Sequence, residues 1–386
     1  MTAPAPDHRM FDHTDVFAAL NGKLPLSGKV EFVHASLKQR FAFIDRVAIA
    51  VYDPKTDLLK TFVHSSSGDQ PLSLYGAKLA DSASLQAILR SGRPRVVNDL
   101  NAFKRATAEH SRRIAAQKYG ASYTMPMYLN GDFFGFLFFN SYQKNVFDES
   151  VLHYLDIIGH LLSLLVIQET SSNRNLTSTV RTAADMAQHR DFETGAHLDR
   201  MANYARLIAR DVAQKHQLSD ELVEQIFLFS PLHDIGKIGI PDSILLKPAK
   251  LSTSEFDLMK THTLRGAEII DQMLENFGFS DLPHIHLLRN IALLHHEALN
   301  GSGYPNGLTA DEIPIEARIV AVADVFDALT SSRPYKKAWS NDEAFAFLQE
   351  MAGSKFDADC VAALIAARTE IEAVQARFRE DSHDRA

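Results

Sequence analysis

The stretch "SPLHDIGKIGIPDSILLKP", residues 230–248, places a histidine, an aspartate and a lysine close together among apolar residues. His233 and Asp234 are adjacent, and Lys237 follows a few positions later. A buried charge is costly unless it is paired or bound to a metal ion. The rest of the chain must therefore supply either partners or a metal ion for these side chains.

Other histidines and carboxylates interrupt apolar helical segments in the second half of the chain. They are Glu193, His197, His262, His295, His296 and Asp324. Any one of them could be a hydrogen-bonded core residue or half of a surface pair. Together with His233 and Asp234 they make eight such groups, and each would cost about 1–3 kcal/mol if it were buried unpaired. A shared metal cluster accounts for all of them.

The types of ligand narrow the choice of metal. The chain has one cysteine, Cys360, so a thiolate cluster and an intrachain disulfide are excluded. Imidazole and carboxylate suit iron, manganese or zinc, and eight ligands suit two or three ions rather than one. A site with several ions can generate hydroxide near neutral pH and bind both oxygens of an in-line phosphoryl displacement. The residues thus point to metal-assisted phosphoester chemistry.

The order of these motifs resembles the HD superfamily of metal-dependent phosphohydrolases, and within it the HD-GYP branch. "HDIGKIGIPDSILLKP" (233–248) and "HHEALNGSGYPNGL" (295–308) carry the resemblance, and the second contains the GYP signature intact. "DVFDALTSSRPYK" (324–336) and "GSKFDAD" (353–359) match later motifs of the family. The resemblance covers about residues 185–364. It implies an all-α helical bundle that hydrolyses cyclic di-GMP to pGpG, and often onward to GMP.

The resemblance also implies a role for each site residue. The two-metal ligand set corresponds to His233, Asp234, His262, His295, His296 and Asp324, and Glu193 and His197 correspond to the extra ligands of three-metal members. Asp234 would bridge the ions, and Lys237 would face the scissile phosphate. Arg333 would bind the second phosphate, and Tyr304 and Lys336 would contact the substrate. Iron is the expected metal, with manganese and zinc as alternatives.

The first half of the chain has a mixed pattern. Residues 46–53 and 58–66 are β-prone runs separated by a turn, and "YTMPMYLNGDFFGFLFFNS" (123–141) predicts a hairpin around its Asn-Gly pair. Residues 84–92 predict a short helix with an N-cap serine, and residues 93–100 contain a further strand. This order resembles a GAF domain, a small α+β sensory module with an antiparallel sheet and a ligand cup. A scaffold or dimerisation module of the same fold, without a ligand, fits equally well.

A helical stripe connects the two halves. Its apolar positions are Leu152, Leu155, Ile158, Leu162 and Leu165. A long helix between two domains commonly pairs with a copy of itself, although the first half could be a core helix of the first domain. We therefore expect a flexible leader (1–20), a GAF-like domain (21–150), a linker helix (151–185) and an HD-GYP domain (186–386), assembled as a homodimer.

The bulk properties limit the partners and the location. A net charge of −8 argues against a nucleic-acid polymer as partner, because such binders are usually basic. The N-terminus has no apolar core of the signal-peptide type. The apolar stretch 154–167 is short for a membrane span and contains Asp156 and His160. We expect a cytoplasmic protein without a membrane segment.

Three other functions fit parts of the pattern. The substrate could be another cyclic dinucleotide such as 3′,3′-cyclic GMP-AMP, since no residue plainly separates adenine from guanine. The chain could be a non-catalytic module that binds cyclic di-GMP and signals to a partner, although the complete ligand set favours an enzyme. An HD nucleotidase that acts on mononucleotides is disfavoured by the GYP signature.

Overall fold

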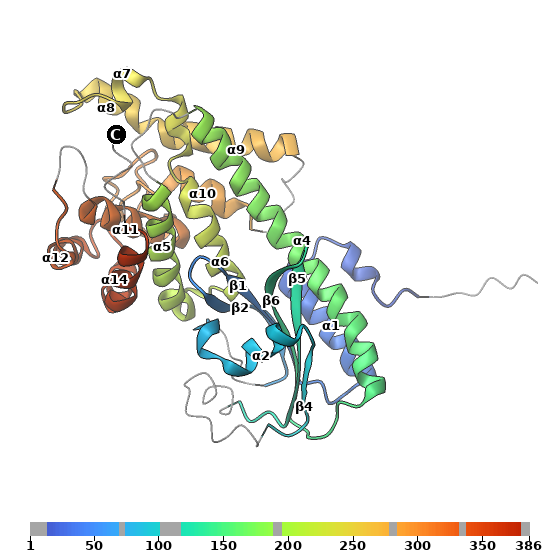
Figure 1. The fold of residues 1–386 in the computed structure, drawn as a ribbon. Helices are drawn as coiled ribbons and strands as arrows, with labels where there is room; N and C mark the ends of the chain where they lie inside the picture. The colour runs from blue at the N-terminus through green and yellow to red at the C-terminus, as the bar shows by residue number, and fades with distance from the viewer. Residues whose placement is uncertain are drawn as a thin grey trace, which may run out of the picture. The chain divides into compact units, whose positions relative to one another are not determined.

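The computed structural model describes residues 14–68, 74–100, 117–187, 195–277, 284–331 and 337–379. Contacts between residues divide the chain into two compact units. The described residues of 1–49, 63–71 and 79–162 form the first, and those of 50–62, 72–78 and 163–386 form the second. Strands predominate early in the chain and helices later (Figure 1). The predicted order, an α+β part followed by an all-α part, is confirmed.

The sheet has six strands in the order β3-β2-β1-β6-β5-β4. The strands are β1 (Arg46–Asp53), β2 (Leu58–Ser66), β3 (Gly76–Lys78), β4 (Arg95–Val97), β5 (Ala121–Leu129) and β6 (Asp132–Ser141). The pairs β2–β3, β4–β5 and β5–β6 are antiparallel. At the tip of the β5–β6 hairpin, Asn130 (φ 52°) and Gly131 (φ 93°) are both left-handed, as a tight two-residue turn requires. The hairpin predicted from the Asn-Gly pair is confirmed.

Helices α1 (Leu26–Arg40) and α2 (Ala83–Ser91) accompany the sheet, with the short 3-10 helices η1 (Ala18–Asn21) and η2 (Leu79–Asp81). The predicted helix over 84–92 is α2, but its N-cap is Ser82 and not Ser84. Ser82 has non-helical backbone angles, whereas Ser84 already lies inside the first turn. Gly92 ends the helix with φ 63°, which glycine adopts without strain.

The long helix α4 (Glu149–Ala187) has 39 residues. Leu155, Ile158 and Leu162 are almost fully buried. Gly159 lies directly against the sheet, since a Cβ atom there would meet Met125 Sδ at 2.4 Å. The first half of α4 is therefore a core helix of the first unit. This was one of the two interpretations of the apolar stripe at residues 152–165; the other was a helix that pairs with a second copy of itself.

The same helix contains the single candidate membrane span among the described residues, Glu149–Ser171, by length and composition alone. This apolar segment is longer than residues 154–167 suggested. In the structure 44% of its most apolar window is buried against the protein itself.

The second unit contains a helical bundle. Its elements are α5 (Gly195–His216), α6 (Asp220–Phe229), η4 (Ser230–Leu232), η5 (Ile235–Gly239), α7 (Asp242–Leu245), α8 (Thr253–Lys260), α9 (His262–Phe277), α10 (His286–Leu294), η6 (Ala310–Glu312), α11 (Ile315–Thr330), α12 (Asn341–Met351), α13 (Ala358–Ala366) and α14 (Arg368–Arg377). Tyr204, Phe326 and Phe345 stack in its core. In this bundle α5 packs against α6 and α11, α10 packs against α9 and α11, and α9 packs against η5. These elements carry or adjoin the predicted ligands.

Candidate metal centre

The motif around His233 follows a helix end. Helix α6 stops at Phe229, and Pro231 then begins the tighter turn η4 that leads into His233. Asp234 is the N-cap residue of η5, but its side chain makes no capping hydrogen bond there. Gly236 lets η5 cross α9 closely, because a Cβ atom at Gly236 would lie 1.8 Å from the carbonyl oxygen of His262. This crossing brings Asp234 to His262.

A first ligand group consists of Asp234, His262, His295 and His296, whose ligand atoms lie within 4.8 Å of one another. The Oδ1 atom of Asp234 lies 3.1 Å from His262 Nε2 and 3.6 Å from His295 Nε2. His295 and His296 follow α10 directly, and their ring centroids are 4.0 Å apart. Four ligands on three separate elements thus converge on one volume.

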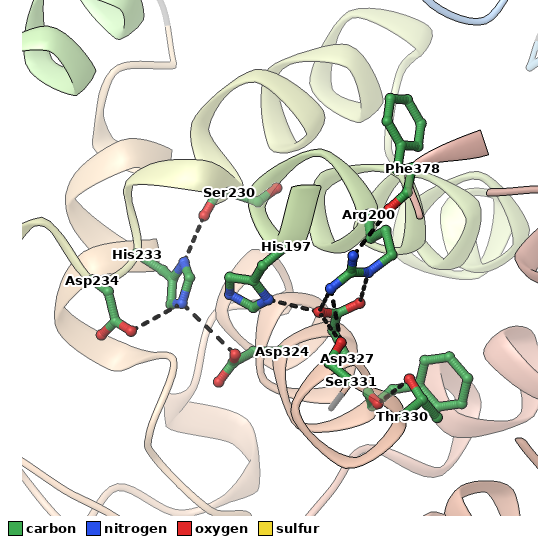
Figure 2. A network of polar contacts seen from close by, with 11 residues as sticks. His197, Arg200, Ser230, His233, Asp234, Asp324, Asp327, Thr330, Ser331 and Phe378 are labelled. Atoms are coloured by element: carbon green, nitrogen blue, oxygen red, sulfur yellow. Dashed lines mark hydrogen bonds and ion pairs between the residues drawn. The ribbon is translucent and has the colours of Figure 1, made fainter. Parts of the chain in front are cut away.

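A second ligand group consists of His197 from α5, His233, and Asp324 from α11, again within 4.8 Å. Figure 2 shows the three side chains pointing toward one another. His233 Nε2 lies 3.8 Å from Asp324 Oδ1 and 3.3 Å from Asp234 Oδ2. Asp234 therefore contacts histidines of both groups, which is the position of a bridging carboxylate.

Hydrogen bonds fix three of the imidazole rings. The Nδ1 atoms of His233, His262 and His295 lie 2.9, 2.8 and 2.9 Å from backbone carbonyls three or four residues earlier. A carbonyl only accepts, so each Nδ1 carries the proton and donates. Each Nε2 therefore keeps its lone pair and is directed at the centre, which is the arrangement of a metal-binding histidine.

Electrostatics favour the same protonation states. Burial lowers the pKa of His295, and burial with the neighbouring His295 lowers that of His296 far below its usual range. Burial would raise the pKa of Asp234, but the Lys237 ammonium opposes it, and that pKa lies well below its usual value. Lys237 Nζ lies 2.6 Å from Asp234 Oδ2. Neutral imidazoles beside an ionised carboxylate are what metal binding requires.

The loop with the GYP sequence lies against the first group. The Tyr304 ring is 4.7 Å from the His296 ring, and the Tyr304 N–H donates to the His296 carbonyl at 3.1 Å. Gly303 allows this approach, since a Cβ atom there would lie 2.3 Å from Ala298 N. Burial, then Asp234 and Asp324, raise the pKa of Tyr304, so its hydroxyl keeps its proton and can donate.

The structure brings seven of the eight predicted ligands into the two groups. Glu193, Arg333 and Lys336 lie outside the described residues. Sequence reasoning missed Glu297, whose carboxylate accepts from Asn306 N at 2.7 Å and Leu308 N at 3.0 Å. The feature of the sequence that could have pointed to Glu297 is its position directly after His295 and His296.

Sequence reasoning also missed Asp327 and Arg200. Asp327 is fully buried and accepts from His197 Nδ1 at 2.7 Å and from Arg200 Nε at 2.8 Å (Figure 2). Burial would raise the pKa of Asp327, but His197 and Arg200 lower it below its usual value. The available signal is spacing, because Asp327 and Arg200 each lie one helical turn after a predicted ligand.

Comparison with known proteins gives a family match for the second half of the chain. Residues 181–360 match the family described as HD domain. The chain is 46% identical over 200 residues to the cyclic di-GMP phosphodiesterase response regulator RpfG of Xanthomonas campestris, covering 52% of this chain and 50% of that protein. It is 38% identical over 236 residues to a cyclic di-GMP phosphodiesterase of Vibrio cholerae, covering 58% of this chain and 48% of that protein.

A further relative is named for a different substrate. The 3′3′-cGAMP-specific phosphodiesterase 2 of Vibrio cholerae is 37% identical over 216 residues, covering 56% of this chain and 38% of that protein. The chain thus spans half or less of the length of these three relatives. A phycocyanobilin-bound GAF domain from a cyanobacterial phytochrome is similar in structure, with a TM-score of 0.33 and 16% identity over 40% of this chain and 90% of that chain.

Proposed function

We propose that the HD domain formed by residues 181–360 makes this protein a metal-dependent phosphodiesterase that hydrolyses cyclic di-GMP to pGpG. The observation that carries the proposal is the Asp234 carboxylate, which contacts histidines of two adjacent ligand groups. Two such groups sharing one carboxylate suit a pair of cations, and a cation pair suits phosphodiester cleavage. Relatives named as cyclic di-GMP phosphodiesterases support the choice of substrate.

The donor set fits divalent cations. Six buried or half-buried side chains in addition to Asp234 offer imidazole nitrogen or carboxylate oxygen, and none offers a thiolate. We propose iron as the metal, with two ions in the described groups and a third beside Glu193. Bound cations would lower the pKa of water and neutralise charge on phosphoryl oxygens.

The roles of the protein's own groups follow from their positions. Lys237 pairs with Asp234 at the edge of the first group, where its ammonium can stabilise charge that develops on a phosphate oxygen. The Tyr304 hydroxyl can donate to the substrate. Arg333 and Lys336 are proposed to bind the other phosphate, since the "RPYK" segment follows α11, which carries Asp324.

A second candidate substrate is 3′,3′-cyclic GMP-AMP. One relative at 37% identity is named as specific for it. The ligand groups would contact metal and phosphate and not the base, so their geometry does not distinguish the two dinucleotides.

The organisation of the chain is part of the proposal. We propose a leader (1–20), a GAF-like domain (21–150) that controls the enzyme, a linker helix (151–185) and the catalytic domain (186–386), in a cytoplasmic homodimer. Ile157 and Leu164 support the dimer, because they lie two turns apart on α4 and remain 70% and 66% exposed. Large apolar side chains repeated along one helix face suit a second helix.

The decisive experiment combines elemental analysis of anaerobically purified protein with turnover assays on both dinucleotides. We expect bound divalent metal, release of pGpG, and a loss of at least about 100-fold in kcat/KM for Asp234→Ala, the scale of losing one transition-state contact. Asp242→Ala, an exposed aspartate of the neighbouring α7, is the control and should retain activity. Metal-loaded protein that binds the dinucleotide for hours without product would make this a binding module instead.

A further inference from the structure

We propose that Asp327, held by Arg200, is a positioning residue for His197 and thereby sets the occupancy of the second cation position, the one formed by His197, His233 and Asp324. The inference rests on the metal binding in the proposed function but not on the choice of substrate. It assigns a role to the buried Arg200–Asp327 pair, which belongs neither to the sequence motifs nor to the direct metal ligands.

The first observation is a difference between His197 and three other histidines of the centre. His233, His262 and His295 each donate Nδ1–H to a carbonyl three or four residues earlier in the chain. Their ring orientation is therefore fixed locally. His197 instead bonds through Nδ1 to a carboxylate 130 residues away on another helix. Its orientation depends on how α5 and α11 meet.

The second observation is the geometry around that carboxylate. Arg200 donates to it from two nitrogens, Nε to Oδ1 at 2.8 Å and Nη2 to Oδ2 at 2.9 Å. The Ser331 hydroxyl donates to Oδ2 at 3.0 Å. Such a two-point guanidinium contact fixes the plane of a carboxylate as well as its charge. The plane of Asp327 in turn fixes the ring of His197.

The chemistry follows from the direction of one proton. An ionised carboxylate only accepts, so His197 Nδ1 must donate to Asp327. The Nε2 atom lies on the side of His233 and Asp324 (Figure 2), and it then keeps its lone pair. A carboxylate bonded to the far nitrogen also makes an imidazole a stronger donor to a metal ion.

The third observation is that α5 and α11 each supply one ligand of the second position and one member of the charge pair. Helix α11 supplies the ligand Asp324 and, one turn later, Asp327. Helix α5 supplies the ligand His197 and, one turn later, Arg200. The charge pair therefore sets the spacing between two of the three ligands of the second position, while the first group contains no residue of either helix.

The test measures metal and needs no substrate. The full-length Asp327→Asn variant is loaded with Mn²⁺, and binding is followed by calorimetry and by elemental analysis after dialysis. We expect one ion per chain fewer than in the wild type, or an affinity for that ion weaker by about 10–100-fold, with the remaining ions unchanged. Wild-type stoichiometry and affinity in folded Asp327→Asn would overturn the proposal.

Two further variants keep the test decisive. Arg200→Lys retains the positive charge but loses the two-point contact, so it should weaken the same ion selectively, and it replaces Asp327→Asn if that variant does not fold. Asp211→Asn makes the same carboxylate-to-amide change at an exposed position near the far end of α5, so it should bind metal like the wild type. If the wild type itself binds no Mn²⁺, the metal centre of the proposed function fails. If all variants bind like the wild type, only the role of Asp327 fails.

Discussion

At the scale of single residues, Glu297 connects the metal centre to the loop that carries Tyr304. It follows His296 directly, is 6% exposed, and accepts from two backbone N–H groups beyond Tyr304, those of Asn306 and Leu308. Each carboxylate oxygen takes one donor, so the loop is held at two points. This carboxylate therefore supports the loop that places Tyr304 beside His296.

We expect Glu297→Gln to disturb substrate binding more than metal binding. The amide that replaces one oxygen cannot accept, so one N–H of the loop loses its partner, at a cost of about 0.5–1.5 kcal/mol in the free energy of unfolding. KM for the dinucleotide should rise while the metal content stays constant. Thermal unfolding, elemental analysis and steady-state kinetics measure the three effects. Glu350→Gln, at an exposed position of α12, controls for the lost charge; equal behaviour of both variants would refute the role of Glu297.

The direct ligands were predictable from sequence, whereas the residues that support them were not. Asp324 stands out because it interrupts an apolar helix, and His295 and His296 stand out because they end an apolar run. Asp327 also lies in an apolar helix, but a buried aspartate can pair with any arginine, and the sequence does not say that the arginine is Arg200. Glu297 accepts from a loop whose backbone conformation the sequence does not specify.

At the scale of elements, the crossing of η5 over the start of α9 holds the first ligand group together. Gly236 and Gly266 face each other at this crossing, with a Cβ built on Gly266 lying 3.4 Å from Gly236 N. The Gly236 side of the crossing has less room than the Gly266 side. A Cβ on Gly236 would meet backbone atoms of His262 and Gly266 at 1.8 and 2.4 Å. Backbone cannot move aside as a side chain can.

We therefore expect Gly236→Ala to separate η5 from α9 and lower metal content, since Asp234 and His262 lie on the two sides of the crossing. Gly266→Ala is the matched control from the other side. Its Cβ fits at 3.4–3.5 Å, and alanine inside a helix should offset the contact by about 0.5–1 kcal/mol. Elemental analysis and thermal unfolding distinguish the variants, and full metal content in Gly236→Ala would show that the crossing tolerates a side chain.

The elements themselves were largely readable in advance. β1 and β2 occupy residues 46–53 and 58–66 as predicted, because a turn sequence bounds two strongly apolar runs. Helix α6 ends four residues before His233, earlier than the apolar run suggested, since Pro231 favours the tighter turn of η4. Strand β3 has three residues and little apolar character, so local pattern gave no signal for it.

At the scale of the whole molecule, the proposed dimer depends on the outward face of α4. The inward face is committed to the sheet, as Leu155 and Leu162 show. The outward face exposes Ile157 and Leu164 to water, and burying both against a second copy would gain about 1.5–3 kcal/mol for each side chain.

We expect the double variant Ile157→Glu, Leu164→Glu to be monomeric where the wild type is dimeric. An unpaired buried charge costs about 3–5 kcal/mol, so association should weaken by at least about 100-fold. Sedimentation at micromolar concentration measures this directly. Gln214→Glu, at an exposed position of α5, controls for added negative charge. A wild type that sediments as a monomer would remove the basis for the dimer.

The end of the last helix has a consequence for how the protein can be shortened. Arg200 also donates from Nη1 to the carbonyl oxygen of Phe378, the residue that caps α14, at 3.0 Å. A version of the chain that stops before α14 would take away one of the anchors of that guanidinium. The C-terminal helix thus helps orient the His197 imidazole on α5 through Arg200 and Asp327. We expect the first effect of such a truncation to be weaker binding of metal ions.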